Sequence, residues 1–195
     1  MGVSYQHRWH LVVVLKYMAH IHTKPGQHDH TASAYILRTD FEEPKIMLHL
    51  HKKIGKYLQF GGHVELHETP WQAVVHELRE ESGYDIDQLR ILQPADRVGR
   101  LSDAVIHPQP VAHSTHPFGG NTDHFHTDIA YAIVTDEEPR HSPEDGESTT
   151  IKLFTRQELA ALGEDDLPDN VKQIAFFIFD KCLNNWEAIP MTEFN

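Results

Sequence analysis

The chain has 195 residues and a formal net charge of -12 at pH 7, with 17 Lys and Arg against 29 Asp and Glu. This acidity argues against a nucleic-acid polymer or an anionic membrane as partner, because both attract clustered Lys and Arg. The one cysteine, Cys182, has no internal disulfide partner, and neither a secretory signal nor an apolar run of membrane-spanning length is present. We expect one compact domain over residues 1–195, in the reducing cytoplasm.

The N-terminal segment, residues 1–28, predicts a helix followed by a loop. Residues 9–22 carry apolar side chains at spacings of three and four, although the β-branched run in residues 12–14 also fits a strand. The length of the segment favours the helix, and its apolar character makes it a candidate homodimer interface. Pro25 and Gly26 mark a loop over residues 23–30.

A β-hairpin is predicted next. Residues 31–38 and 45–52 have the composition of strands, and the turn-like residues 40–44 separate them. The hairpin leads the chain toward the glycine pair Gly61 and Gly62.

A helix is predicted after this glycine pair, and both of its ends are marked. Thr69 is placed to cap the N-terminus, with Gln72 three residues later to complete a capping box. Pro70 occupies the first helical position, where its missing N–H costs nothing. Gly83 is suited to the left-handed conformation that closes a helix.

The second half of the chain predicts further strands and helices. Residues 85–99 indicate a strand that breaks at Pro94, and residues 101–121, rich in Pro and Gly, predict a long loop. A strand is predicted over residues 123–135, and residues 140–148 are a polar loop.

The C-terminal part begins with a short strand that passes into a short helix over residues 151–162. Thr155 and Glu158 form a second capping box there. The last helix is predicted over residues 168–183, within a C-terminal helical segment that we assign to residues 165–195, and its apolar stripe is expected to close the core.

The helix that follows Thr69 carries an unusual set of acids. At about 100° per residue, its apolar side chains share one stripe and three glutamates, Glu77, Glu80 and Glu81, share a flank. Three neighbouring carboxylates repel one another, and a divalent cation removes that conflict. Oxygen ligands of this kind suit Mg²⁺ or Mn²⁺, and Mg²⁺ commonly joins carboxylates to substrate phosphates. A solvated acidic face is the alternative interpretation of such a run.

The spacing of these residues is specific. Counting from Gly62, five residues lead to Glu68, seven more lead to His76 and Glu77, and then follow Leu78, Arg79, Glu80, Glu81, Ser82, Gly83 and Tyr84. This pattern resembles the Nudix box, which has Gly, five residues, Glu, seven residues, Arg-Glu, an aliphatic residue, any residue, Glu-Glu, any residue, Gly and a bulky apolar residue. The one departure is His76, which stands where the family has Arg.

The resemblance to Nudix (MutT-like) pyrophosphohydrolases implies a fold and an activity. The implied fold is an α/β/α sandwich around a mixed sheet, and the implied reaction is Mg²⁺- or Mn²⁺-dependent hydrolysis of a nucleoside diphosphate linked to another group. By position, the Gly61 carbonyl with Glu77, Glu80 and Glu81 would hold the metal ions. Glu68 would support the loop and the helix.

The general base and one further metal ligand remain open at this point. Glu77 or Glu81 is our first choice for the base that takes a proton from water. Family members also recruit a ligand or base from a later loop, and Glu147 lies where such a residue is expected. An exposed loop acid is the alternative interpretation of Glu147.

The departure at His76 predicts reduced or pH-shifted activity. An imidazole supplies neither the fixed charge nor the five donors of Arg, but His76 can donate one hydrogen bond and lies one helical turn before Glu80.

A second candidate site lies on the strand over residues 123–135. Alternation places His124, His126 and Asp128 on one face of that strand. We expect His126 and Asp128 to line the substrate pocket, with plain packing and a transition-metal site as the alternatives. His63, in the loop of the box, is a candidate phosphate contact, and the alternative for it is a solvated side chain.

Three functions are consistent with these residues. The first is a Nudix-type hydrolase of a small nucleoside diphosphate derivative. The second is a binding or regulatory module that kept the fold and lost turnover, which His76 suggests. The third is a zinc or nickel protein, which the 17 histidines suggest.

Overall fold

The computed structural model describes residues 24, 26–117 and 124–194, whose backbone is organised around one sheet. The strands are β1 (Gln27–Arg38), β2 (Lys45–Leu50), β3 (Tyr57–Leu58), β4 (Phe60–His63), β5 (Arg90–Gln93), β6 (Ala112–Pro117), β7 (His124–Thr135), β8 (Ile151–Thr155) and β9 (Glu187–Pro190). The helices are α1 (Pro70–Glu77), α2 (Arg156–Ala161) and α3 (Asp169–Phe177). The shorter helical turns are η1 (Leu78–Ser82), η2 (Ile86–Gln88), η3 (Ile178–Cys182) and η4 (Met191–Phe194).

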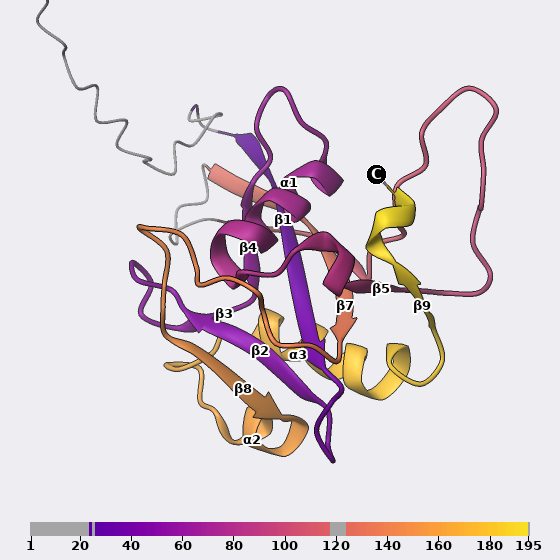
Figure 1. Cartoon of the computed structure of the whole chain (residues 1–195). Coiled ribbons are helices and arrows are strands. Elements are labelled where there is room, and N and C mark those ends of the chain that lie inside the picture. The colour runs from indigo at the N-terminus through magenta and orange to yellow at the C-terminus, as the bar shows by residue number, and fades with distance from the viewer. Residues whose placement is uncertain (1–23, 25, 118–123, 195) are drawn as a thin grey trace, which may run out of the picture.

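The sheet is mixed. Its main path runs β3-β2-β1-β7-β5-β9, while β4 pairs with β1, β6 with β7 and β8 with β2. The two longest strands, β1 and β7, lie parallel at its centre, and the other described pairs are antiparallel. Figure 1 shows α1 in front of β1, and the residues of α2 and α3 pack on the other side of the sheet.

Alternation along β1 separates two hydrophobic cores. Ala32, Ala34 and Ile36 pack on one face with residues of α1, including Trp71 and Val74. Side chains on the opposite face, among them Tyr35 and Leu37, pack with residues of α2 and α3. The fold is therefore the α/β/α sandwich with a mixed sheet that the sequence predicts.

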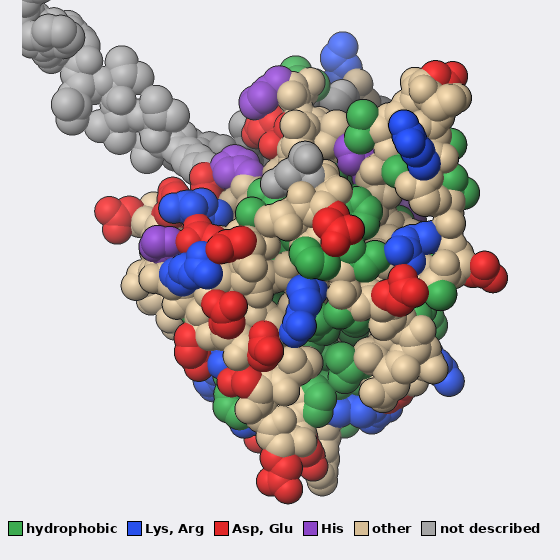
Figure 2. Space-filling view, turned by 45° about the vertical axis from the view of Figure 1, so that its right-hand side comes forward, with side chains coloured by type: hydrophobic (Ala, Val, Ile, Leu, Met, Phe, Trp, Pro, Cys, Tyr) green, Lys and Arg blue, Asp and Glu red, His purple; other side chains and the backbone are tan. Residues whose placement is uncertain are grey.

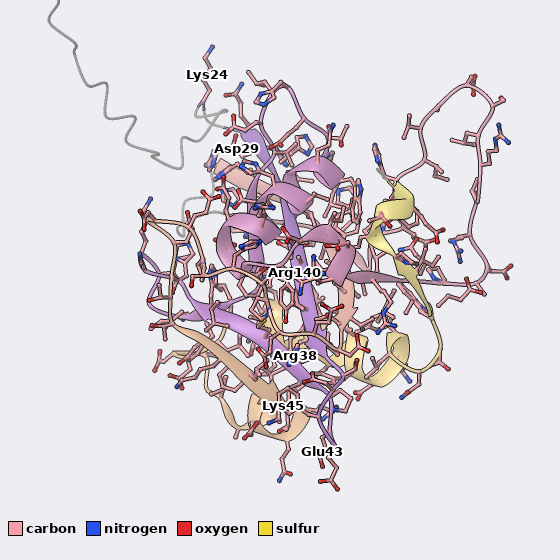
Figure 3. All side chains as sticks on the ribbon, viewed as in Figure 1. Lys24, Asp29, Arg38, Glu43, Lys45 and Arg140 are labelled. Atoms are coloured by element: carbon pink, nitrogen blue, oxygen red, sulfur yellow. The ribbon has the colours of Figure 1, made fainter. Side chains whose placement is uncertain are left out.

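Polar and apolar residues occupy different ends of the parallel pair β1 and β7. Asp29 is paired with His126 and Thr31 with Asp128, whereas further along the two strands aliphatic residues pair with one another. Figure 3 labels Asp29 and Arg38 at the two ends of β1. The polar ends of both strands consequently meet at the same end of the sheet.

The hairpin, the strands after Gly83 and the capped helices are confirmed. Residues 36–38 of β1 pair with residues 45–47 of β2, and both predicted capping boxes are present, on Thr69 and on Thr155. Gly83 has a φ of 76°, and a Cβ there would overlap the His141 carbonyl. The predicted end of this helix therefore needs glycine.

Three predictions on element boundaries are wrong. The loop predicted over residues 23–30 ends at Gly26, because residues 27–30 already pair with β7. The long loop over residues 101–121 contains β6, which pairs with β7 along its whole length. The C-terminal segment 165–195 is helical only in part, because η3 ends at Cys182 and β9 then pairs with β5.

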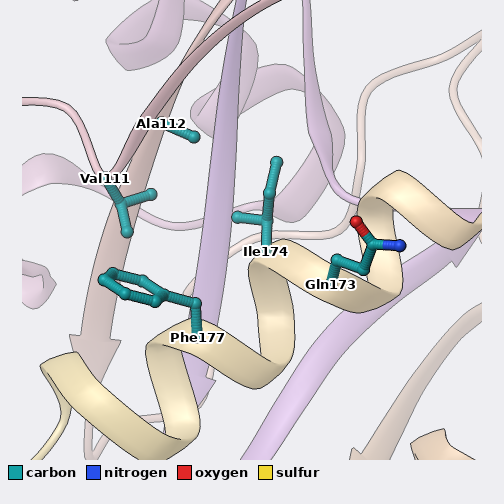
Figure 4. A pocket seen from close by; sticks show the side chains of 5 residues that line it. All are labelled: Val111, Ala112, Gln173, Ile174 and Phe177. Atoms are coloured by element: carbon teal, nitrogen blue, oxygen red, sulfur yellow. The ribbon is translucent and has the colours of Figure 1, made fainter.

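The described part of the chain contains no helix long and apolar enough to cross a bilayer. A shallow apolar cavity of about 200 Å³ lies between α3 and the start of β6, lined by Val111, Ala112, Gln173, Ile174 and Phe177 (Figure 4). None of these five lining residues carries a charge. The N-terminal helix predicted over residues 9–22 lies outside the described residues.

Candidate active site

The glutamate-bearing helix begins at a capping box and changes its geometry at the acids. The Thr69 hydroxyl accepts the Gln72 N–H, and the Gln72 side chain accepts the Thr69 N–H at 2.9 Å. The α-helix ends at Glu77, and the π-helical turn η1 carries Glu80 and Glu81. Such wide turns are uncommon in helices and are often found at functional sites.

The glycine pair brings β4 against this helix. The Gly61 N–H donates to the Glu81 carboxylate at 2.8 Å. A Cβ at Gly62 would overlap the Glu77 carboxylate, so Glu77 packs directly on the Gly62 backbone. A Cβ at Gly61, where φ is 133°, would overlap the Ala32 backbone. Gly61 is therefore required by its φ and its close approach to β1, whereas Gly62 lets the Glu77 carboxylate lie against the backbone.

The carboxylate of Glu81 is buried among other acids. Burial is the main cause that raises its pKa to about 9; the Gly61 N–H opposes the rise, and the charges of Glu77, Glu147 and Glu80 add to it. The His49 ring lies 3.8 Å from Glu81, but burial lowers the pKa of His49 to about 4. With these pKa values both groups are neutral at pH 7 in the absence of a cation, so this contact is not a salt bridge.

His76 contacts two of the acids. Its Nε2 lies 2.7 Å from Glu80, and its Nδ1 lies 3.9 Å from Glu68. The Glu68 carboxylate also accepts the Glu65 N–H at 2.9 Å, which closes the loop before α1. His76, the residue that departs from the box, therefore lies between Glu68, the first glutamate of the box, and Glu80, a later one.

The loop that carries Glu147 is attached to the same helix. The Glu144 N–H donates to the Glu80 carbonyl at 2.8 Å, and the His141 N–H donates to the Gly83 carbonyl at 3.1 Å. Glu147 is half-buried and is one of the charges that raise the pKa of Glu81. The structure thus brings the predicted later acid close to the box.

These residues fit a divalent cation. Carboxylates from α1, η1 and the loop before β8 converge, and one of them is buried in a position where ionisation is unfavourable without a counter-charge. Hard oxygen donors of this kind suit Mg²⁺ or Mn²⁺. The Gly61 N–H points to Glu81, while the proposed role of the Gly61 carbonyl stays a prediction.

A second polar group lies at the polar ends of β1 and β7. Asp128 is buried and accepts hydrogen bonds from the Thr31 and Ser33 hydroxyls, each at 2.8 Å. Burial raises the pKa of Asp128, and these two hydrogen bonds oppose the rise. Alternation along β1 places this group on the face away from α1.

Next to Asp128, two histidines from different strands contact one acid. His63 Nε2 lies 3.8 Å from the Asp29 carboxylate, and His124 Nε2 lies 3.2 Å from it. The His126 ring stands edge-on to the His63 ring, with centroids 5.0 Å apart. Asp29 was not predicted as a site residue, because residues 23–30 were interpreted as a loop. The alternation of the polar residues Asp29, Thr31 and Ser33 with other residues was the signal of a strand.

Comparison with known proteins agrees with this architecture. The NUDIX domain family matches residues 29–175, which is most of the chain. The chain therefore belongs to the Nudix family of pyrophosphohydrolases, as its box predicts. None of the curated proteins compared with the chain gives a significant match.

Solved structures with the same fold are numerous. A hydrolase of the NUDIX family from Clostridium perfringens has 28% sequence identity and a TM-score of 0.63, covering 79% of this chain and 97% of that one. A C. elegans Ap4A hydrolase, at 15% identity and a TM-score of 0.55, covers 78% and 98%. The NUDIX domain of Shewanella oneidensis NrtR, complexed with ADP ribose, has 10% identity and a TM-score of 0.56, covering 77% and 85%.

Proposed function

We propose that this protein hydrolyses a diphosphate linkage in a nucleoside diphosphate derivative and that it requires Mg²⁺ or Mn²⁺. The observation that carries the proposal is the convergence of Glu77, Glu80 and Glu147 on the buried carboxylate of Glu81. A protein of net charge -12 needs a cation between such a cluster and an anionic diphosphate.

The roles of the residues follow from their positions. Glu77, Glu80, Glu81 and Glu147, with the Gly61 carbonyl, hold the cation. When bound, the ion neutralises phosphate oxygens and lowers the pKa of a water molecule. Glu77 or Glu81 accepts the proton of the attacking water. Glu68 acts from the side of the loop, where its contacts to Glu65 and His76 hold the start of the helix.

The group attached to the diphosphate binds at the polar ends of β1 and β7. We assign His63, His126 and Asp128 to this pocket, because all three are buried polar side chains beside the glycine pair of the box. Proteins of the same fold are described as an Ap4A hydrolase, a UDP-X diphosphatase and a domain complexed with ADP ribose. These names share a nucleoside diphosphate and differ in the attached group, which supports the substrate class that we propose.

A panel of nucleoside diphosphate derivatives tests the proposal. We expect release of a mononucleotide or phosphate product from at least one member when Mg²⁺ is present and none after chelation. Glu81→Gln and Glu77→Gln should each lower kcat by about 100-fold or more, while the melting temperature measured without metal does not fall. The matched control is Glu164→Gln, which changes an exposed acid after α2 and should leave the rate unchanged.

The second candidate is a module that binds a nucleotide without turnover. It is favoured by one observation, His76 in place of the Arg of the box. Tight binding of one panel member, measured by calorimetry, together with no product from any member would establish this candidate and refute the enzyme.

A further inference from the structure

The histidines and the acid at the polar end of the sheet have their own chemistry. We propose that Asp29, His63 and His126 bind a transition-metal ion of the zinc type, at a site separate from the glutamates of the box. Each of these residues offers one ligand atom, and the three atoms lie within 4.8 Å of one another. Figure 2 shows histidine side chains in the upper part of the molecule, the end at which Figure 3 labels Asp29.

The three ligands come from three neighbouring strands. Asp29 of β1 is paired with His126 of β7, and His63 of β4 is paired with Thr31, two residues along β1 from Asp29. Residues two apart on a strand point to the same face, so all three side chains leave the sheet on one side. A site on a hydrogen-bonded sheet is held more firmly than one on loops.

The burial of these three side chains favours the binding of a cation. Asp29 is 1% exposed, and His63 and His126 are 9% and 8% exposed. A buried carboxylate is stabilised by opposite charge, and two of the side chains that contact Asp29, His63 and His124, are imidazoles that are cationic only when protonated. A divalent ion supplies that charge while the imidazoles stay neutral.

The distances need only small side-chain movements. In a tetrahedral zinc site with bonds of about 2.0–2.2 Å, the ligand atoms lie roughly 3.4 Å apart. The Asp29 carboxylate and His63 Nε2 are 3.8 Å apart before any ion is bound. All three ligand atoms lie within 4.8 Å of one another, so each separation must shorten by about 1.4 Å or less, a change that side-chain torsions can supply.

The donor types select the metal. Two imidazole nitrogens and one carboxylate oxygen suit Zn²⁺, Co²⁺ or Ni²⁺, whereas Mg²⁺ prefers oxygen donors. Three protein ligands leave a position for water or a substrate atom. His124, 3.2 Å from the Asp29 carboxylate, can orient that ligand or complete the set.

Two of the ligands are residues that we also assign to the substrate pocket. An ion at this site would therefore place a positive charge on the pocket wall, beside Asp128, and would favour substrates whose attached group has anionic or nitrogen ligands. This consequence rests on the proposed function, but the binding of the metal does not.

The test is zinc binding to the full chain in the presence of excess Mg²⁺. Calorimetry with ZnCl₂ should give one tight site per chain, and Co²⁺ at the same site should give the intense visible absorption of a tetrahedral ion. His63→Ala and Asp29→Asn should weaken zinc by about 100-fold or more, since even residues behind the ligands cost 10- to 100-fold. Glu81→Gln should leave zinc affinity unchanged, which separates this site from the box.

The matched control is His30→Ala. His30 lies on β1 directly after Asp29 and is exposed, and its neighbours in the strand show that its side chain points to the other face. Equal zinc affinity in the parent, His63→Ala and His30→Ala would overturn the proposal, as would loss of zinc in Glu81→Gln alone. Circular dichroism of each variant ensures that lost binding is not lost folding, and Asp29→Asn, close in size to the parent residue, provides a second variant if His63→Ala does not fold.

Discussion

At position 76 one imidazole contacts two glutamates of the box, Glu68 eight residues before it and Glu80 four residues after it. Its Nε2 holds Glu80 at 2.7 Å, while its Nδ1 faces Glu68 at 3.9 Å. The hydrogen bond orients the Glu80 carboxylate, whereas the longer contact leaves the Glu68 carboxylate beside the ring. In the position where the box has Arg, His76 therefore contacts both glutamates, though with fewer hydrogen-bond donors than Arg has.

This geometry predicts the result of exchanging His76. His76→Ala should lower kcat by about 10- to 100-fold, because Glu80 and Glu68 lose the group between them. His76→Arg should match or exceed the parent rate, because it restores a fixed charge and more donors. Steady-state kinetics on the same substrate measures both. His67→Ala, an exposed histidine of the same loop, is the control, and a His76→Arg variant slower than the parent would contradict the argument.

The two glycines of the box predict two different phenotypes. Gly61→Ala should lower stability, because its Cβ meets the Ala32 backbone and its φ of 133° disfavours any other residue. Gly62→Ala should mainly lower kcat, because its Cβ meets the movable Glu77 carboxylate instead of a backbone. Urea unfolding and kcat of the two variants, measured side by side, separate the effects. Equal loss of stability in both would refute this distinction.

A helix or strand can be predicted from the sequence when the residues that determine it lie close together in the chain. The start of α1 could be predicted because Thr69, Pro70 and Gln72 act within one turn. The end of the helical segment, after η1, could be predicted because Gly83 takes a left-handed conformation. The flank of glutamates followed from helical spacing, although the π-helical turn that carries Glu80 and Glu81 has no comparable signal in the sequence.

Elements that depend on distant partners could not be predicted. β6 contains Pro117 and exposed polar residues, and only its pairing with β7 makes it a strand. β9 has four residues and pairs with β5, almost a hundred positions earlier in the chain. The contacts of Asp29 to His63 and His124 also arise from the register of three strands, although the alternation of Asp29, Thr31 and Ser33 was a local signal of the strand itself.

The far end of β1 predicts a pH-dependent contribution to stability. Arg38 donates to both carboxylate oxygens of Asp40, at 2.8 and 2.6 Å, and also contacts Glu138. The hydrogen bond from Arg38 lowers the pKa of Asp40, so its contribution is present above the ordinary pKa of an Asp and is lost as pH falls through the lowered value.

Replacement of Asp40 measures this contribution. Asp40→Asn should cost about 1 kcal/mol at pH 7, a modest value because Asp40 is partly exposed. The difference from the parent should shrink as the pH falls below about 4. Urea unfolding across this range is the measurement, and Asp103→Asn, in an exposed loop, is the control. A difference that grows in acid would show that the sign is wrong.

For the whole molecule, the two cores share one sheet, and we expect the proposed cation at the box to add to global stability. We predict a single cooperative unfolding transition for the chain, in keeping with one domain. Mg²⁺ at 100 times its Kd should stabilise the native state by about 2.7 kcal/mol, or roughly 5 to 10 °C in melting temperature. Calorimetric melting with and without Mg²⁺ measures this shift. Glu81→Gln should abolish most of it, and an unchanged shift in that variant would place the ion elsewhere.

The register of β1 and β7 bears on how such a protein can change in evolution. Ile36 pairs with Ile133 in the apolar half of these strands, whereas Asp29 pairs with His126 and Thr31 with Asp128 in the polar half. Exchanges in the polar half remove little of the apolar surface that both cores bury, so they cost the cores less than exchanges in the apolar half would. The same two strands can therefore acquire a new ligand preference at one end while the other end continues to hold the fold.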